Sequence, residues 1–291
     1  MATLLSLKRR IKAAQNVSKT TKAMQMIAAS KLKRAQDATL ASRPYVEKLS
    51  TLVSDIADRI DEKNYHPYMK MQAETGKTLI IALSPDKGLC GGLVTNLLKE
   101  FFKVSDTHKN AEYVVFGKKL EGQVSKLPNE VLATFQFGTT LPSFDVVYPL
   151  TELINEYYLG KKVDSVQVLY TDFASIFSQK PTVSQLLPVS ITKSDEEDDE
   201  QHHSFSLFEP GVQTMLPELL KHYLEMKLYQ YFLESFVSEQ AARMIAMQNA
   251  TSNAKDIITD LRLEYNKTRQ AKITSELLDI TGTKRQEGTE L

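Results

Sequence analysis

A single cysteine in a glycine-rich stretch is the first candidate for chemistry. The segment SPDKGLCGG at 84–92 places Cys90 between Gly88 and Gly92 in the pattern G-x-C-x-G. In the nucleophile elbow of hydrolases, a strained turn from strand to helix exposes the reactive side chain in this way. A cysteine hydrolase also needs a base to form the thiolate, and no histidine follows a strand-like segment, where such a base usually stands. We therefore favour the alternative that the glycines permit a tight turn and that Cys90 is a small buried residue.

Two further segments have the residue types of a binding site without the required spacing. The triplet GKT at 76–78 matches the end of a phosphate-binding loop, but Met71 stands where that loop needs another glycine. The histidine pair at 202–203 follows the acidic run DEEDDE at 195–200, and adjacent residues in a solvated loop chelate a metal poorly. The sequence therefore predicts no cofactor, no metal and no catalytic residue.

Composition limits the class of protein. Of the 291 residues, 42% are hydrophobic and 25% are charged, which is typical of a chain that buries a substantial core. Basic and acidic residues balance at 36 each, so net charge predicts neither nucleic acid nor membrane insertion, although residues 1–36 hold nine Lys or Arg and no acidic residue. One cysteine excludes an intramolecular disulfide, and no apolar run approaches the roughly 18 to 20 residues of a membrane span.

Two segments without glycine or proline predict long helices. Residues 1–43 and 218–281 contain neither, and the second would extend roughly 95 Å, too far for a helix to bury itself in a compact domain. Each needs a partner helix, and we expect the two to pack on each other in antiparallel orientation with coiled-coil spacing. The expected seam positions are Leu4, Leu7, Ile11, Ala14, Val17, Thr21, Met24, Ala28, Leu32 and Ala35, and Leu219, Tyr223, Met226, Leu233, Val237, Met244, Met247, Ile258, Leu261 and Tyr265.

Many seam positions are small or polar. Such residues allow two helices to approach closely, but they bury less apolar surface than a seam of leucine and isoleucine. The residues concerned are Ala14, Ser18, Thr21, Ala28, Thr251 and Ala254.

The middle of the chain has the pattern of an α/β domain. Apolar or β-branched runs at 78–84, 112–117, 131–137 and 166–173 predict strands, with a final strand around 185–191. Helical patterns alternate with these runs, which indicates a mainly parallel, Rossmann-like sheet. The expected parts are an N-terminal helix at 1–60, a central α/β domain at 75–192, an acidic linker at 193–208 and a C-terminal helix at 209–285.

Four stretches, in order along the chain, carry a family resemblance. They are LKRRIKAAQNVSKTTKAMQMIAASKLKRAQ at 7–36, SPDKGLCGGLVTNL at 84–97, SEQAARMIAMQNATSNAKDII at 238–258 and YNKTRQAKITSELLDITGT at 265–283. Together they resemble the gamma subunit of rotary ATP synthases over essentially the whole chain. Because the resemblance begins within a few residues of Met1, we expect the basic start to belong to the first helix and not to a removable signal.

The resemblance implies a rotor subunit that performs no bond chemistry itself. It implies a shaft of two antiparallel helices inside a ring of alpha and beta subunits, with the α/β domain contacting an epsilon-type subunit and a membrane c-ring. Such a chain couples rotation of the ring in a proton-translocating complex to the nucleotide sites. It would lie peripherally at the cytoplasmic face of the bacterial inner membrane, or at the matrix side of the mitochondrial one. A hydrolase using Cys90 and a coiled-coil adaptor with an acidic partner are the alternatives.

The resemblance also implies two groups of ring contacts. The lower group, expected beside an acidic loop of a beta subunit, consists of Lys22, Met24, Gln240 and Arg243. The upper group, in which a guanidinium and an amide would exchange hydrogen bonds with a ring loop, consists of Arg269, Gln270 and Thr274.

Overall fold

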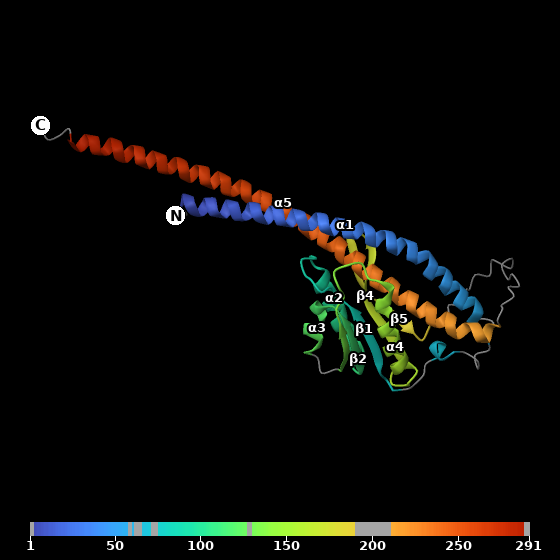
Figure 1. The fold of residues 1–291 in the computed structure, drawn as a ribbon. Coiled ribbons are helices and arrows are strands. Elements are labelled where there is room, and N and C mark those ends of the chain that lie inside the picture. Colours follow the sequence, from blue (N-terminus) through green and yellow to red (C-terminus); the bar gives the residue numbers. More distant parts are fainter. Residues whose placement is uncertain are drawn as a thin grey trace, which may run out of the picture. The chain divides into compact units, whose positions relative to one another are not determined.

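Two long helices contribute to both compact units of the computed structural model. The model describes residues 3–57, 60, 66–70, 75–126, 130–189 and 211–287. One unit is formed by Met1–Ile27 with Met244–Leu291, and the other by Ala28–Arg243. Helices α1 (Leu4–Ala57) and α5 (Val212–Glu287) each supply residues to both units (Figure 1). The predicted acidic linker at 193–208 lies outside the described residues.

Both helices continue through a proline, which interrupts the hydrogen-bond ladder of each. Pro217 is the sixth residue of α5 and lacks the N–H that would otherwise donate to the carbonyl four residues earlier. Pro44 lies inside α1, and the residues on either side of it are tied to α5. Arg43 Nη2 donates to Glu234 Oε1 at 3.0 Å, and the Tyr45 hydroxyl lies 2.8 Å from His222 Nε2. These contacts hold α1 in place where its own hydrogen-bond ladder is interrupted.

In the first unit α1 and α5 form the predicted small-residue seam. Buried or half-buried positions of α1 recur at 7, 11, 14, 18 and 21, and those of α5 at 247, 251, 254, 258, 261, 265 and 268. Both series alternate steps of three and four, which is the spacing of a two-helix coiled coil. Val17 is 53% exposed, so its assignment to the seam was wrong, and Ser18 takes that place.

The second unit contains a five-stranded sheet with the order β3-β2-β1-β4-β5. The strands are β1 (Thr78–Leu83), β2 (Ala111–Phe116), β3 (Val131–Phe135), β4 (Ser165–Ser175) and β5 (Ser178–Leu187). All neighbours are parallel except β4 and β5, which form an antiparallel hairpin. The last strand begins seven residues before its predicted start at 185, because hairpin pairing with β4 extends it over polar residues that carry no apolar pattern.

Helices cover both faces of this sheet. Helices α2 (Leu93–Thr107) and α3 (Lys118–Val124) pack through Leu97, Phe101 and Leu120 against alternate residues of β1 and β2. Helix α4 (Val147–Tyr158) precedes β4 and lies on the other side of the sheet in Figure 1. That placement follows from right-handed crossovers, since the chain leaves β1 toward β2 and returns to the opposite neighbour, β4. Two short 3₁₀ helices, η2 (Pro67–Met69) and η3 (Phe144–Val146), complete the unit.

Helix α5 is embedded in the second unit. Every residue from 230 to 242 is buried, so this segment is enclosed on all sides and not only on one stripe. Phe232 packs edge-on against Phe116 of β2 with ring centroids 4.8 Å apart, and Tyr231 lies 4.3 Å from the ring of Tyr170 in β4. A buried Phe or Leu contributes roughly 1.5–3 kcal/mol, so this segment ties α5 firmly to the sheet.

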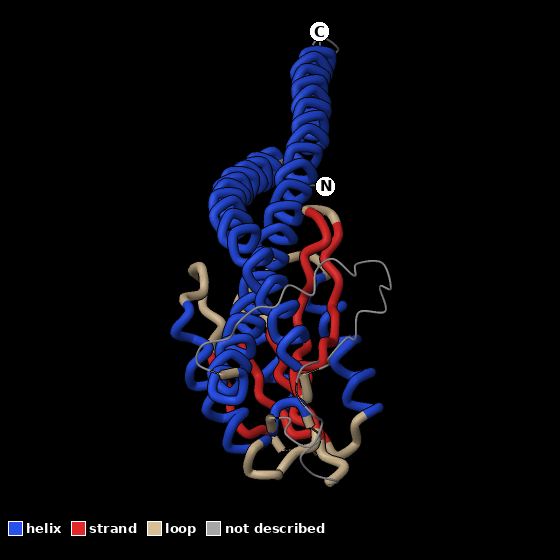
Figure 2. Tube along the Cα trace, turned by 90° about the vertical axis from the view of Figure 1, so that its right-hand side faces the viewer, coloured by secondary structure: helices blue, strands red, loops and turns tan. Residues whose placement is uncertain are grey.

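Two serines of α5 complete the hydrogen bonding of β4 where β1 has ended. The pairing of β1 with β4 stops at Leu169, and beyond it the two long strands continue as a two-stranded ribbon (Figure 2). The backbone of Thr171 would lack a partner on the side of β1. Its N–H donates to Ser235 Oγ at 3.3 Å, and its carbonyl accepts from Ser238 Oγ at 3.0 Å.

Replacing Ser238 with alanine tests this attachment. Ser238 is fully buried, so Ser238→Ala leaves the Thr171 carbonyl without its donor and should lower the free energy of unfolding by about 1–3 kcal/mol. The measurement is urea unfolding of the full chain followed by circular dichroism. Ser50→Ala, at an exposed position of α1, is the matched control and should change stability by less than about 0.5 kcal/mol. Equal effects of the two substitutions would show that the serine does not anchor β4.

Candidate partner-contact surfaces

The glycine-rich loop after β1 is held from two sides by groups of its own chain. The Asp86 carboxylate accepts hydrogen bonds from the N–H groups of Lys118, at 3.1 Å, and Gly138, at 2.7 Å. Arg243 of α5 donates through Nη2 to the carbonyl oxygens of Lys87, at 3.2 Å, and Gly88, at 3.3 Å. In open α/β sheets, ligands usually bind at the carboxyl ends of the strands where the strand order reverses, which here is between β1 and β4. The chain's own helix α5 occupies that place.

Cys90 is buried and is a poor nucleophile. Its side chain packs with Leu93 and Ala242 and is 1% exposed. Burial raises the pKa of the Cys90 thiol, and the Arg243 guanidinium opposes this shift more weakly. The reactive thiolate is therefore disfavoured. The turn is made by positive φ angles at Leu89 and Gly91, which agrees with the predicted tight turn and small buried cysteine.

A buried ion pair lies beside the thiol. Glu239 Oε1 is 2.6 Å from Arg243 Nη2, and both side chains are mostly buried, with 3% and 12% exposed. Burial raises the pKa of the Glu239 carboxyl despite the opposing effect of Arg243. Within the described structure the second oxygen, Oε2, has no hydrogen-bond partner. The pair aligns Arg243 with the loop carbonyls, so its visible role is to join α5 to the loop.

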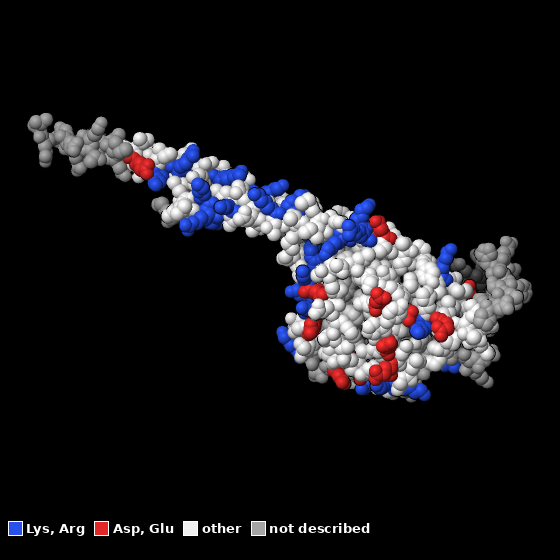
Figure 3. Space-filling model, viewed as in Figure 1, with Lys and Arg blue, Asp and Glu red and all other residues white. Residues whose placement is uncertain are grey.

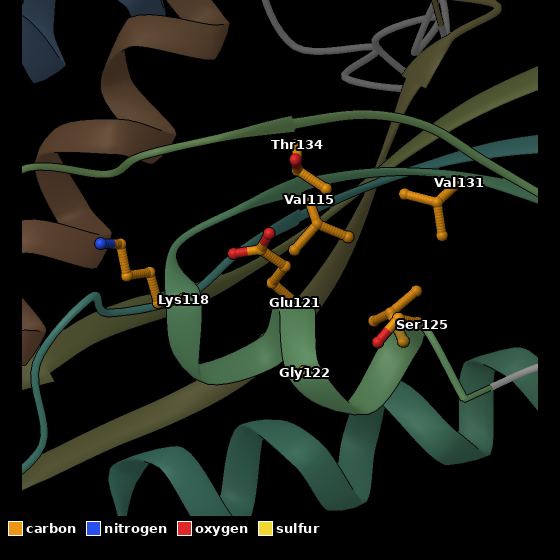
Figure 4. A pocket seen from close by; sticks show the side chains of 8 residues that line it. Val115, Lys118, Glu121, Gly122, Ser125, Val131 and Thr134 are labelled. Carbon is orange, nitrogen blue, oxygen red and sulfur yellow. The ribbon is translucent and has the colours of Figure 1, made fainter.

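A hollow beside α3 lacks the groups that catalysis requires. It has a volume of about 540 Å³ and is lined largely by Val115, Val124 and Val131. The charged residues at its wall are Lys118 and Glu121, and Lys118 points away from the valines labelled in Figure 4. The wall contains neither cysteine nor histidine. Among the described residues no cluster of three or more metal-ligating side chains is found. The wall also contains the hydroxyl groups of Ser125 and Thr134, but it contains no histidine that could serve them as a base.

Helix α1 presents a strongly basic surface in the first unit. Residues 3–27 of α1 include Lys8, Arg9, Arg10, Lys12, Lys19 and Lys22, all exposed, and no acidic residue. Blue atoms accordingly line the helices in Figure 3. A dense field of one sign attracts a surface of opposite sign and repels a copy of itself. This face suits an acidic protein partner.

The predicted lower contact group is divided between the two units. In the first unit Lys22 is exposed and donates through Nζ to Gln25 Oε1 at 3.3 Å, while Met24 is half-buried. In the second unit Gln240 is only 2% exposed, and Arg243 is engaged by Glu239 and the loop carbonyls. The structure therefore assigns internal contacts to Gln240 and Arg243. Contact of this group with a partner stays a prediction.

The predicted upper contact group lies on an exposed part of α5. Residues 269–278 are all exposed, whereas Thr268 is the last half-buried position. Thr274 Oγ1 donates to the Gln270 carbonyl of its own helix at 3.0 Å, and neither Arg269 nor Gln270 has a side-chain partner among the described residues. Ile273, Leu277 and Leu278 are 48%, 58% and 65% exposed. This helix end presents apolar and polar groups together, as a protein contact does.

Sequence reasoning missed the groups that fix α5 to the sheet. Ser235, Ser238 and Thr171 were not singled out, because a serine on a helix carries no signal of its buried partner. A usable signal was present in YQYFLESFVSEQAA at 229–242, which is apolar or uncharged around most of the helix. Such a segment predicts burial on all sides. In the part of the chain that the structure describes, none of the helices combines the length and apolarity needed to cross a membrane.

Comparison with known proteins relates this architecture to one family. The model of the ATP synthase family matches residues 3–284. The ATP synthase gamma chain of Dehalococcoides mccartyi (strain CBDB1) is 37% identical over 284 residues, which cover 97% of this chain and 98% of that relative. The ATP synthase gamma chain of Paraburkholderia phymatum is also 37% identical, over 292 residues, with the same coverage of both chains.

A solved structure supports the fold. A chain from the Euglena gracilis mitochondrial ATP synthase, in a structure of OSCP, F1 and c-ring, superposes with a TM-score of 0.70. The match covers 99% of this chain and 96% of that one, at 19% sequence identity. The fold predicted from the sequence, two long helices with a Rossmann-like α/β domain, is confirmed.

Thiol labelling tests whether Cys90 is structural. We expect the native chain to react with Ellman's reagent at pH 8 at least about tenfold more slowly than an exposed cysteine, because burial both shields the thiol and raises its pKa. The control is Leu89→Cys in a Cys90→Ala chain, since Leu89 is the neighbouring residue and is 62% exposed. Rapid labelling of native Cys90, or a hydrolase activity lost in Cys90→Ala, would restore the nucleophile interpretation.

Proposed function

Because the chain belongs to the ATP synthase gamma chain family, we propose that α1 and α5 form the central shaft whose contacts change as the rotor turns. As the gamma chain of an ATP synthase, the protein is the rotor subunit that couples ion movement to ATP synthesis or hydrolysis. A turning shaft of unequal faces stabilises a different conformation of each surrounding subunit in turn. The difference in interaction free energy between faces is what couples rotation to nucleotide affinity.

The observation that carries this proposal is the exposed end of α5. Residues 269–278 continue beyond the last half-buried position, and they include three large apolar residues at the surface. An isolated helix end gains little stability in water, so it is stabilised chiefly by packing. A sleeve formed by a ring of other subunits supplies such packing without fixing one orientation.

The partners follow from charge and position. The basic face of α1 suits acidic loops of alpha and beta subunits, with Lys22, Met24, Gln240 and Arg243 as the lower contact. Arg269, Gln270 and Thr274 form the upper contact. The α/β domain carries the surface for the epsilon-type subunit and the c-ring, and the related Euglena structure contains F1 and a c-ring. Nucleic acid and direct membrane insertion have no place in this assignment.

We further propose that this chain is non-catalytic within the complex. The supporting observations are the buried Cys90, the loop held by Asp86 and Arg243, and a hollow whose wall contains neither cysteine nor histidine. The complex places the chain peripherally at a membrane. Its side is the cytoplasmic face of the bacterial inner membrane, in keeping with bacterial relatives such as those of Dehalococcoides and Paraburkholderia, with the mitochondrial matrix side as the alternative.

Removing one upper contact tests this proposal. In membrane vesicles containing the complex, Arg269→Ala should leave assembly intact and lower ATP-driven ion pumping by about tenfold, since a hydrogen bond of a charged group contributes about 1.5–3 kcal/mol. Arg262→Ala, which removes another exposed arginine of α5, is the control and should pump within about twofold of the parent. Equal pumping by both variants would reject the upper contact. If the parent chain does not copurify with the ring of alpha and beta subunits, the rotor assignment itself is wrong.

A further inference from the structure

Two threonine hydroxyls meet inside the seam of the first unit. Thr21 Oγ1 of α1 and Thr251 Oγ1 of α5 are 2.7 Å apart. Thr251 Oγ1 also donates to the Met247 carbonyl of its own helix at 2.7 Å, and Thr21 Oγ1 has a longer contact, 3.2 Å, with the Ser18 carbonyl. Thr251 is 6% exposed, so little water is available to replace the bond between the helices.

The number of hydroxyl protons determines which threonine donates the hydrogen bond between the two helices. A hydroxyl has one proton to donate and two lone pairs to accept. Since Thr251 donates to Met247 at a short distance, its oxygen is the acceptor for Thr21. The result is a relay from the Thr21 hydroxyl to the Thr251 oxygen and from the Thr251 hydroxyl to a backbone carbonyl. Relays of this kind strengthen each bond in the chain.

In the first unit the rest of the seam defines the helix register weakly, because the hydrogen bonds that join α1 to α5 in the second unit, from Arg43 and Tyr45, lie 22 and 24 residues beyond Thr21. The positions one heptad away from the pair are filled by Ala14 and Ala28 on α1, and by Ile258 and Met244 on α5. Sliding α5 by one heptad would place Thr251 beside one of these alanines, and the seam positions would still face each other. Small side chains lose little packing in such a shift, whereas the bond between the threonines would be lost. A single polar pair in a coiled-coil seam is known to fix register in this way.

We infer that the Thr21–Thr251 hydroxyl relay fixes the axial register of α1 against α5 in the first unit. This role deepens the proposed rotor function, on which it rests. A shaft that presents unequal faces to a ring transmits a defined sequence of contacts only if its two helices keep one register. Thr21 and Thr251 are therefore positioning residues, and they act through the helices that carry the partner contacts.

The register is measured by the distance between two spin labels in the full chain. Met26 and Leu263 are 58% and 64% exposed and belong to the first unit, so cysteines there accept labels in a Cys90→Ala chain. Met26 lies five residues after Thr21 and Leu263 twelve residues after Thr251, which separates the labels by about 25 Å along an antiparallel pair. A slip of one heptad changes this separation by about 10 Å.

The variants separate the hydroxyl from the shape of the side chain. Thr251→Val keeps a branched side chain of similar size and removes the hydroxyl, whereas Thr251→Ser keeps the hydroxyl. We expect one narrow distance in the parent and in Thr251→Ser. In Thr251→Val a second distance should appear, with the population of shifted register raised roughly three- to tenfold by loss of one hydrogen bond. Thr21→Val should give the same shifted distance, and the double valine variant should add little to either single change.

The functional measurement is the ratio of ATP-driven ion pumping to ATP hydrolysis in the assembled complex. It should fall severalfold in Thr251→Val and remain at the parent value in Thr251→Ser. A single unshifted distance in all valine variants would overturn the register inference, whatever the pumping ratio. A shifted distance with normal pumping would support the register role and overturn its link to the rotor function. Failure of the parent chain to assemble with the ring would instead count against the proposed function, which the distance measurement on the isolated chain does not require.

Discussion

The enclosure of α5 between α1 and the sheet is the constraint on which the second unit depends. Residues 230–242 of α5 are buried on every side. Hydrogen bonds join this part of α5 to strand β4 through Ser235 and Ser238, and to α1 through Glu234. The adjacent Arg243 joins α5 to the loop after β1. Large apolar side chains supply most of the stability, at roughly 1.5–3 kcal/mol for each fully buried Phe or Leu. The polar contacts determine the position. A turning force applied to the α/β domain therefore reaches α5 through many contacts.

The first unit is built on the opposite principle. Its seam places Ala14, Ala254 and two threonines among larger buried residues such as Leu7 and Leu261, and each buried methyl group of a small residue contributes only about 0.8 kcal/mol. The outer surface is basic or mixed, and residues 269–278 of α5 are exposed. Weak packing leaves the surface available to other subunits and prevents one deep energy minimum with any of them. Secure anchoring in one unit and adaptable contact in the other are what a rotor shaft requires.

The sequence predicted the elements better than their attachments. Apolar residues that recur at every second position in strands, and at every third or fourth position in helices, located four strands and both long helices. These patterns arise because one face of each element is buried. The last strand was misplaced, since β5 is an edge strand whose half-exposed residues, such as Lys180 and Pro181, carry no alternating signal. Gln240 and Arg243 were predicted from the family resemblance as partner contacts, and the structure adds that they are buried or bound within the chain. Contacts between residues far apart in sequence, such as Ser238 with Thr171, leave no local pattern.

The central claim is that the α/β domain and the shaft rotate together against the ring, and single-molecule rotation tests it most directly. A bead attached through Lys99→Cys on α2, in a Cys90→Ala chain, reports motion of the α/β domain when the ring is fixed to a surface. The account predicts continued rotation of the bead in one direction while ATP is hydrolysed, and arrest when hydrolysis stops. A bead that only fluctuates about a fixed angle during steady hydrolysis would contradict it.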